Sequence, residues 1–76
     1  NEQCTQLYQS VVRKTVRAMN LVVIHTNAGM ASALCVWVDR LSFPGVAGTL
    51  AGDDTVLLIT DSEEHACAVM DKLPDL

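Results

Sequence analysis

The stretch Gly48-Thr49-Leu50-Ala51-Gly52-Asp53-Asp54-Thr55-Val56-Leu57-Leu58-Ile59 places β-prone runs on either side of a glycine and two adjacent aspartates. The runs predict two strands, over 46–51 and 55–60, joined by a tight turn at Gly52-Asp53-Asp54. Two neighbouring carboxylates repel each other unless water, a turn or a cation compensates them. In an acidic chain, this turn is therefore where a cationic ligand is expected.

The two halves of the chain repeat one pattern, in which two strand-like runs precede a helical segment. The predicted segments are strands near 10–18, 21–26, 46–51 and 55–60 and helices over 29–41 and 62–73. The first hairpin turns near Ala18-Met19-Asn20. The pattern predicts an α+β fold of two ββα units, with a four-stranded, mainly antiparallel sheet and two helices on one face.

Length and composition limit the class of protein. A chain of 76 residues forms one domain with one small core. Half of the residues are hydrophobic, which is more than such a core buries, so we expect part of them to face another subunit. The net charge of −4 argues against direct nucleic-acid binding. No stretch is long enough to span a membrane, and segment 1–9 is too polar for a signal peptide, which predicts a cytoplasmic location.

The three cysteines are widely spaced and form no Cys-x-x-Cys pair, which is not the pattern of a disulfide framework or a zinc site. Cys4, Cys35 and Cys67 are therefore expected to be reduced thiols, and the last two to be small core residues.

The two predicted helices differ in their surfaces. The helix over 62–73 is apolar on one side only, with Asp61 and Glu64 resembling a capping box and Pro74 marking its end. The helix over 29–41 is apolar nearly all round. Because the sheet covers only one of its sides, the other is expected to contact a second copy of the chain. Ser32 and Asp39 lie two turns apart and share a narrow polar stripe on this helix.

Four interpretations of the Asp53-Asp54 pair remain open from the residues alone. A plain turn is the interpretation that spacing favours. The others are a metal site with His25, general acid/base catalysis, and binding of a guanidinium or ammonium group. No nucleophile, phosphate loop or cofactor motif accompanies the pair, so neither a catalytic residue nor a resident metal or cofactor is predicted.

A basic cluster lies on the first strand. If side chains alternate strictly along it, Arg13 and Arg17 share one face and Lys14 lies on the other. The cluster is expected to be a solvated sheet edge or a set of salt bridges between subunits, and not a DNA contact.

The run over 48–57 resembles the signature Gly-Thr-Ile/Leu-Ala-Gly-Asp-Asp-Thr of the C-terminal domain of the bacterial arginine repressor family. The segment over 22–31 is similar to that family's strand-to-helix junction, and Val38-Asp39-Arg40-Leu41 is similar to the end of its helix. The resemblance extends over residues 10–73. It implies the fold of two ββα units and a regulatory role, not an enzymatic one.

The resemblance also implies a ligand and an assembly. Family members carry an N-terminal winged helix-turn-helix domain that binds operator DNA. Their C-terminal domain forms trimers that pair into hexamers and binds the corepressor L-arginine between the trimers. By this resemblance, residues 1–9 are a linker remnant and 10–76 the arginine-binding oligomerisation domain, with operator DNA bound only through the N-terminal domain.

Site residues follow from the resemblance by position. Asp53 and Asp54 are the main expected contacts of L-arginine, one from each side of the interface, with at least one on the guanidinium. Asp39 and Ser32 lie on the helix that lines the pocket, and Thr49 and Ala51 contribute largely through their backbone. Ser32 stands where many relatives have a longer polar side chain, which favours a bridging water. Ala28 replaces the usual proline before Gly29. The alternatives are a purely structural oligomerisation domain and a small metal-dependent enzyme using the Asp pair.

Overall fold

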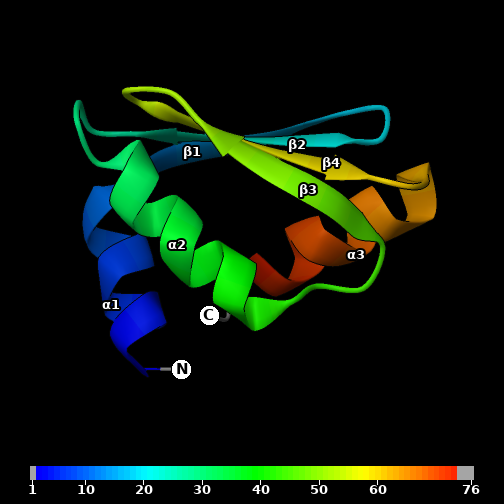
Figure 1. The fold of residues 1–76 in the computed structure, drawn as a ribbon, viewed down its shortest axis with the longest axis horizontal. Helices are drawn as coiled ribbons and strands as arrows, with labels where there is room; N and C mark the ends of the chain where they lie inside the picture. Colours follow the sequence, from blue (N-terminus) through cyan, green and yellow to red (C-terminus); the bar gives the residue numbers. More distant parts are fainter. Residues whose placement is uncertain (1, 74–76) are drawn as a thin grey trace.

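The computed structural model describes residues 2–73, which form three helices and four strands (Figure 1). In chain order the elements are α1 (Glu2–Val11), β1 (Val12–Ala18), β2 (Leu21–Thr26), α2 (Ala31–Leu41), β3 (Val46–Ala51), β4 (Thr55–Thr60) and α3 (Glu63–Lys72). Figure 1 shows the helices together on one side of the sheet. None of the helices in this part of the chain is long and apolar enough to cross a membrane.

The strands form one antiparallel sheet in the order β1-β2-β4-β3. Each hairpin supplies one central strand and one edge strand, so the two ββα units meet where β2 pairs with β4. The predicted α+β class, the four-stranded antiparallel sheet and the packing of helices on it are confirmed.

Helix α1 is the element that the sequence pattern did not predict. The segment expected to be a linker is helical, and the helix continues to Val11, where the first strand was expected to have begun. Val11 is buried, and Leu7 and Tyr8 pack against the core. These apolar positions lie on one side of an otherwise polar helix. Packing of this side against the core is therefore what stabilises the helical conformation of the segment.

Alternation along the central strands builds the core. Val22 and Ile24 of β2 and Val56 and Leu58 of β4 are fully buried toward the helices. Leu34, Val38, Ala66 and Val69 meet them from α2 and α3, with the remaining buried apolar residues Val11, Ala31, Cys35 and Leu73 around them. Both ββα units thus contribute side chains to one small, shared core.

Helix α2 has neighbours on two sides. Its buried residues face the sheet, and α1 packs alongside it. The expectation that only a second copy would cover the other side of this helix was therefore incomplete, since α1 takes part of that role. Val36 still keeps 51% of its surface exposed on the outer side.

The sheet face away from the helices is open and apolar. Val16, Val23, Leu57 and Leu50 pair in register across all four strands and form a continuous row. Leu50 is 65% exposed, and Val16 and Ile59 also expose about two fifths of their surface. This face carries three of the large exposed hydrophobic residues of the described chain, whereas Met19 lies in the β1–β2 turn and Val36 on α2.

A bulge interrupts the pairing of β1 with β2. Val12 pairs with Thr26 and Lys14 with His25, so two steps on β1 oppose one step on β2, and Arg13 is the extra residue. The register keeps Lys14 and Arg17 on opposite faces, as expected, and only Arg13, as the inserted residue, departs from strict alternation. Arg13 and Lys14 line one pocket together with His25 and Thr26 of β2.

Helix α3 begins at a different cap from the one expected. The N-cap residue is Ser62, whose Oγ accepts the His65 backbone N–H at 3.1 Å. Asp61 instead hydrogen-bonds the His65 ring with its carboxylate. The predicted helix end at Pro74 lies outside the described residues.

Gly45 has a φ of +83°, and a Cβ built on it would lie 2.7 Å from the Cβ of His65. Gly45→Ala should lower the free energy of unfolding by about 2 to 4 kcal/mol, because left-handed strain and overpacking add. Gly29 is the matched control, since its φ is +79° but a Cβ there meets nothing within 4 Å. Gly29→Ala should lower the free energy of unfolding, measured in urea, by only about 1 kcal/mol. Equal losses in the two variants would show that His65 does not close over Gly45.

The Asp61–His65 contact predicts an acid dependence of stability. The hydrogen bond from His65 lowers the pKa of the Asp61 carboxyl below its ordinary value of 3.8. Folding therefore favours the ionised form, so the contribution is present above the unfolded-state pKa and is lost as pH falls through the lower folded-state pKa. We expect urea unfolding between pH 2 and 6 to show that Asp61→Asn has a lower free energy of unfolding than the parent near pH 6. The difference between the two proteins should disappear toward pH 2. An equally pH-dependent gap for Asp71→Asn, on an exposed part of α3, would contradict this assignment.

Candidate functional site

The turn at the end of the β3–β4 hairpin is fixed through its backbone. The Gly52 N–H donates to the Thr55 carbonyl at 2.8 Å and closes the turn. The Asp53 carbonyl accepts the N–H groups of Gly29 at 3.0 Å and Ala31 at 3.4 Å, and the Asp54 carbonyl accepts that of Thr26 at 2.7 Å. The hairpin tip is thus joined to the loop between β2 and α2, and both lie at the same end of the sheet in Figure 1.

The same bonds begin α2. Its N-cap residue, Met30, has no side chain that accepts a hydrogen bond from the first turn. The Asp53 carbonyl supplies that acceptor from another part of the chain, which satisfies donors that a helix start leaves unpaired. The tip cannot move without uncovering the start of the helix.

With its backbone held in this way, the tip presents two carboxylates outward. Asp53 and Asp54 are both exposed. The Thr55 hydroxyl donates to Asp54 Oδ1 at 3.0 Å. Within residues 2–73, no donor pairs with the Asp53 carboxylate. The tip therefore combines a rigid backbone with acceptors that are open to an external cation.

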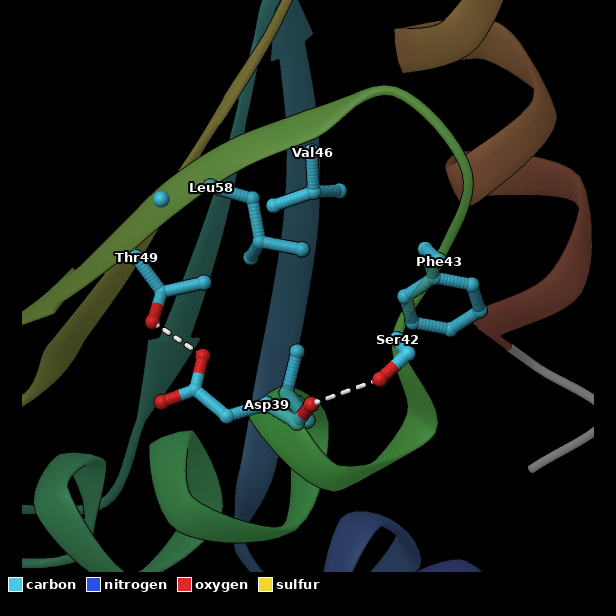
Figure 2. A pocket seen from close by; sticks show the side chains of 8 residues that line it. Asp39, Ser42, Phe43, Val46, Thr49 and Leu58 are labelled. Atoms are coloured by element: carbon cyan, nitrogen blue, oxygen red, sulfur yellow. Dashed lines mark hydrogen bonds between the residues drawn. The ribbon is translucent and has the colours of Figure 1, made fainter.

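A second set of candidate residues lies toward the other end of α2. The Thr49 hydroxyl on β3 donates to Asp39 Oδ1 on α2, and the Cys35 thiol donates to the Thr49 oxygen at 3.3 Å. Figure 2 shows Asp39 and Thr49 pointing toward each other between the helix and the strand. This chain of hydrogen bonds fixes the orientation of the Asp39 carboxylate, which remains exposed to solvent.

A pocket of about 250 Å³ opens beside this pair. Its lining joins a carboxylate and hydroxyls to an apolar floor: Val38, Asp39, Ser42, Phe43, Val46, Gly48, Thr49 and Leu58 (Figure 2). Ser42 ends α2 in a left-handed conformation and donates to the Asp39 carbonyl at 3.5 Å. The pocket suits a ligand with an apolar stem and a cationic group.

The structure divides the predicted site residues into two groups. Ser32 follows Ala31 at the start of α2 and is close to the tip aspartates, whereas Asp39 and Thr49 lie at the pocket. Asp39 follows Ala31 by eight residue steps of α2, which is about 12 Å along the helix axis. Ala51 pairs with Val56 and packs its side chain against the core, which leaves its backbone as the part open to a ligand.

Several lining residues were not predicted from the sequence. Cys35 is four residues before Asp39, a spacing that places the two on one helix face and was available as a signal. Ser42 and Phe43 follow the end of the helix, and nothing in their spacing points to a pocket.

The alternative of a metal site is not supported by any cluster of metal-ligating side chains among the described residues. Across residues 2–73, no three His, Cys, Asp or Glu side chains gather closely enough to hold a metal ion. His25 and Asp54 do line one pocket, but they share it with Arg13 and Lys14, whose positive charges repel a metal ion.

Comparison with known proteins identifies similar sequences over almost the whole chain. The family model described as "Arginine repressor, C-terminal domain" matches residues 8–75. A protein of Solibacter usitatus named arginine repressor is 42% identical over 71 residues, which are 93% of this chain and 49% of that protein. The arginine repressor of Thermus thermophilus is 39% identical over 75 residues, covering 99% and 46%. That of Exiguobacterium sibiricum is 46% identical over 56 residues, covering 74% and 38%.

Two points follow from these matches. The chain spans about half the length, or less, of these relatives. They are named repressors, which regulate transcription and are not enzymes, and this agrees with the expectation of a role without catalysis.

The hydroxyl of Thr49 is predicted to stabilise the fold by joining Cys35 to Asp39. Thr49→Val keeps the shape of the side chain but removes this link, so the free energy of unfolding should fall by about 1 kcal/mol. Urea unfolding measures the loss. Ser32→Ala is the control, because Ser32 is exposed and its replacement should change stability by no more than about 0.5 kcal/mol. A Thr49→Val protein as stable as the control would exclude the hydroxyl link.

Proposed function

This chain belongs to the arginine repressor family and corresponds to its C-terminal domain, and on this premise we propose that it is the effector-binding and oligomerisation domain of an arginine-responsive transcriptional regulator. Its ligand is L-arginine, which acts as the corepressor. The ligand binds where two trimers of the domain meet, and binding stabilises the hexamer. Operator DNA is contacted by a separate N-terminal domain.

The rigid hairpin tip is the observation that carries this proposal. Its backbone hydrogen bonds leave the carboxylates of Asp53 and Asp54 exposed and adjacent. A planar guanidinium pairs with a carboxylate through two parallel hydrogen bonds, so it suits at least one of the two tip carboxylates better than a compact ammonium does. Because adjacent residues in a turn point in different directions, the two carboxylates contact different groups or different ligand copies.

The arrangement of the candidates supports a site shared between copies. Small-ligand sites bury most of the ligand surface, whereas Asp39, Asp53 and Asp54 are all exposed in one copy. Asp39 and Thr49 lie toward one end of α2 and the tip lies at the other. A second copy of the domain would bury the ligand surface that one copy leaves exposed, and it would contribute another set of carboxylates.

The open sheet face supports self-association. The row of Val16, Val23, Leu57 and Leu50 crosses the whole sheet, and exposed Ile59 extends this surface. An apolar surface of this kind on a small acidic domain is typical of a protein interface. Symmetric contact between copies is the simplest way to cover it.

Charge compensation links the ligand to the assembly. Facing rings of Asp53 and Asp54 carboxylates repel when two trimers approach without ligand. L-arginine carries a guanidinium, an ammonium and a carboxylate, so it neutralises this charge and bridges subunits. A ligand that binds the hexamer more tightly than the trimer must stabilise the hexamer by the same free energy.

A structural oligomerisation domain is the second candidate, because the open apolar face requires a partner whether or not a ligand binds. A metal-dependent enzyme using the Asp pair is disfavoured by the cations beside Asp54.

Sedimentation velocity with and without L-arginine tests the proposal. We expect trimers to convert to hexamers when L-arginine is added. Hexamers that are equally stable in its absence, together with no heat of L-arginine binding, would favour the structural candidate and reject the sensor.

Replacement of each tip carboxylate should weaken L-arginine binding. Asp53→Asn and Asp54→Asn remove one charge each and should cost about 2 to 5 kcal/mol of binding free energy in calorimetry, the scale for one partner of a buried charge pair. Asp71→Asn is the matched control, because it removes the same charge from an exposed position on α3. Unchanged L-arginine affinity in both tip variants would reject the site.

A further inference from the structure

A second pocket, of about 400 Å³, lies between the bulged start of β1 and the hairpin tip. Its lining residues are Arg13, Lys14, His25, Thr26 and Asp54. The pocket is large enough for an amino acid. It also includes one of the two tip carboxylates, so it is continuous with the ligand site proposed above.

Two cations of the bulged segment of β1 line this pocket. Arg13 is the inserted residue and Lys14 follows it, and both side chains line the same cavity. Neither cation forms an ion pair within residues 2–73. Arg17, on the same strand, is engaged elsewhere and donates to the Met19 carbonyl at 2.7 Å. The pocket therefore holds two uncompensated positive charges in an acidic chain.

Positive and negative groups face this cavity without neutralising each other. Asp54 lines it together with Arg13 and Lys14, yet no ion pair joins them in the described chain. Such a pocket fits a ligand that carries both charges close together. The head group of a free α-amino acid has this character, with an ammonium that suits Asp54 and a carboxylate that suits the two cations.

We propose that Arg13 and Lys14 bind the α-carboxylate of the amino-acid ligand, with Asp54 on its α-ammonium. This inference rests on the proposed function and deepens it, because it assigns the head group of the ligand to one pocket and leaves the guanidinium to Asp53. His25 and Thr26 form the wall of β2 behind the head group. An inorganic dianion is a poorer fit, since Asp54 repels it.

Isothermal titration calorimetry with L-arginine and L-argininamide tests the assignment. L-argininamide replaces the carboxylate with a neutral amide and keeps the ammonium and the guanidinium. The parent chain should bind L-arginine about 10- to 100-fold more tightly than the amide, the ratio for loss of hydrogen bonds to a charged group. In Arg13→Gln and Lys14→Gln, this ratio should fall toward one, with little change in the affinity for the amide.

Lys72→Gln is the matched control, because it removes a cation from exposed α3 and should preserve the ratio. Circular dichroism checks that each variant is folded, and the Arg13→Gln, Lys14→Gln double variant provides a second measure of the ratio. An undiminished ratio in the folded variants would overturn the carboxylate assignment and leave the proposed function intact. Equal weakening of both ligands would also overturn it, since that result indicates a contact between subunits. Absence of L-arginine binding by the parent chain would instead reject the proposed function itself.

Discussion

The Asp53 carbonyl, which accepts the N–H groups of Gly29 and Ala31, is the contact on which the rest of this structure depends. It joins the hairpin of the second ββα unit to α2, the helix of the first unit. It also supplies the acceptor that Met30 lacks at the start of α2. Since α2 carries Ser32 and Asp39, this one carbonyl sets the tip and the helix in a fixed relation. The backbone carbonyls of Asp53 and Asp54 are engaged in hydrogen bonds of the fold, whereas their side-chain carboxylates are free to contact a ligand.

The strands were predictable because short apolar runs bounded by turn residues leave few alternatives. β2, β3 and β4 lie where the runs over 21–26, 46–51 and 55–60 placed them. Helix α1 was not predicted, since its mostly polar sequence resembles a linker. Only in the folded structure do Leu7, Tyr8 and Val11 pack against the core. The bulge at Arg13 and the cap at Ser62 were also missed, because each depends on a local backbone path that side-chain periodicity does not encode.

The candidate site was predictable only in part. Adjacent carboxylates at Asp53 and Asp54 are visible in the sequence as a charge that folding does not explain. The pairing of Asp39 with Thr49 depends on how α2 crosses β3, which is a tertiary contact between separate segments. The cavity at Arg13 and Lys14 is formed between the start of β1, the end of β2 and the docked tip, which are separate segments of the chain. Residue identities therefore indicate the chemistry, while the packing of the elements decides which groups act together.

The two edges of the sheet differ in their tendency to aggregate. β1 exposes an edge interrupted by a bulge and flanked by Arg13, Lys14 and Arg17, features that prevent a strand of another molecule from adding to it. β3 is the opposite edge. Its register is also irregular, between Val46 and Gly48, but its sequence Val46-Ala47-Gly48-Thr49-Leu50-Ala51 carries no charge. Uncontrolled strand addition is thus directed to β3. In an isolated copy, the irregularity between Val46 and Gly48 and the net negative charge of the chain are what oppose strand addition at that edge.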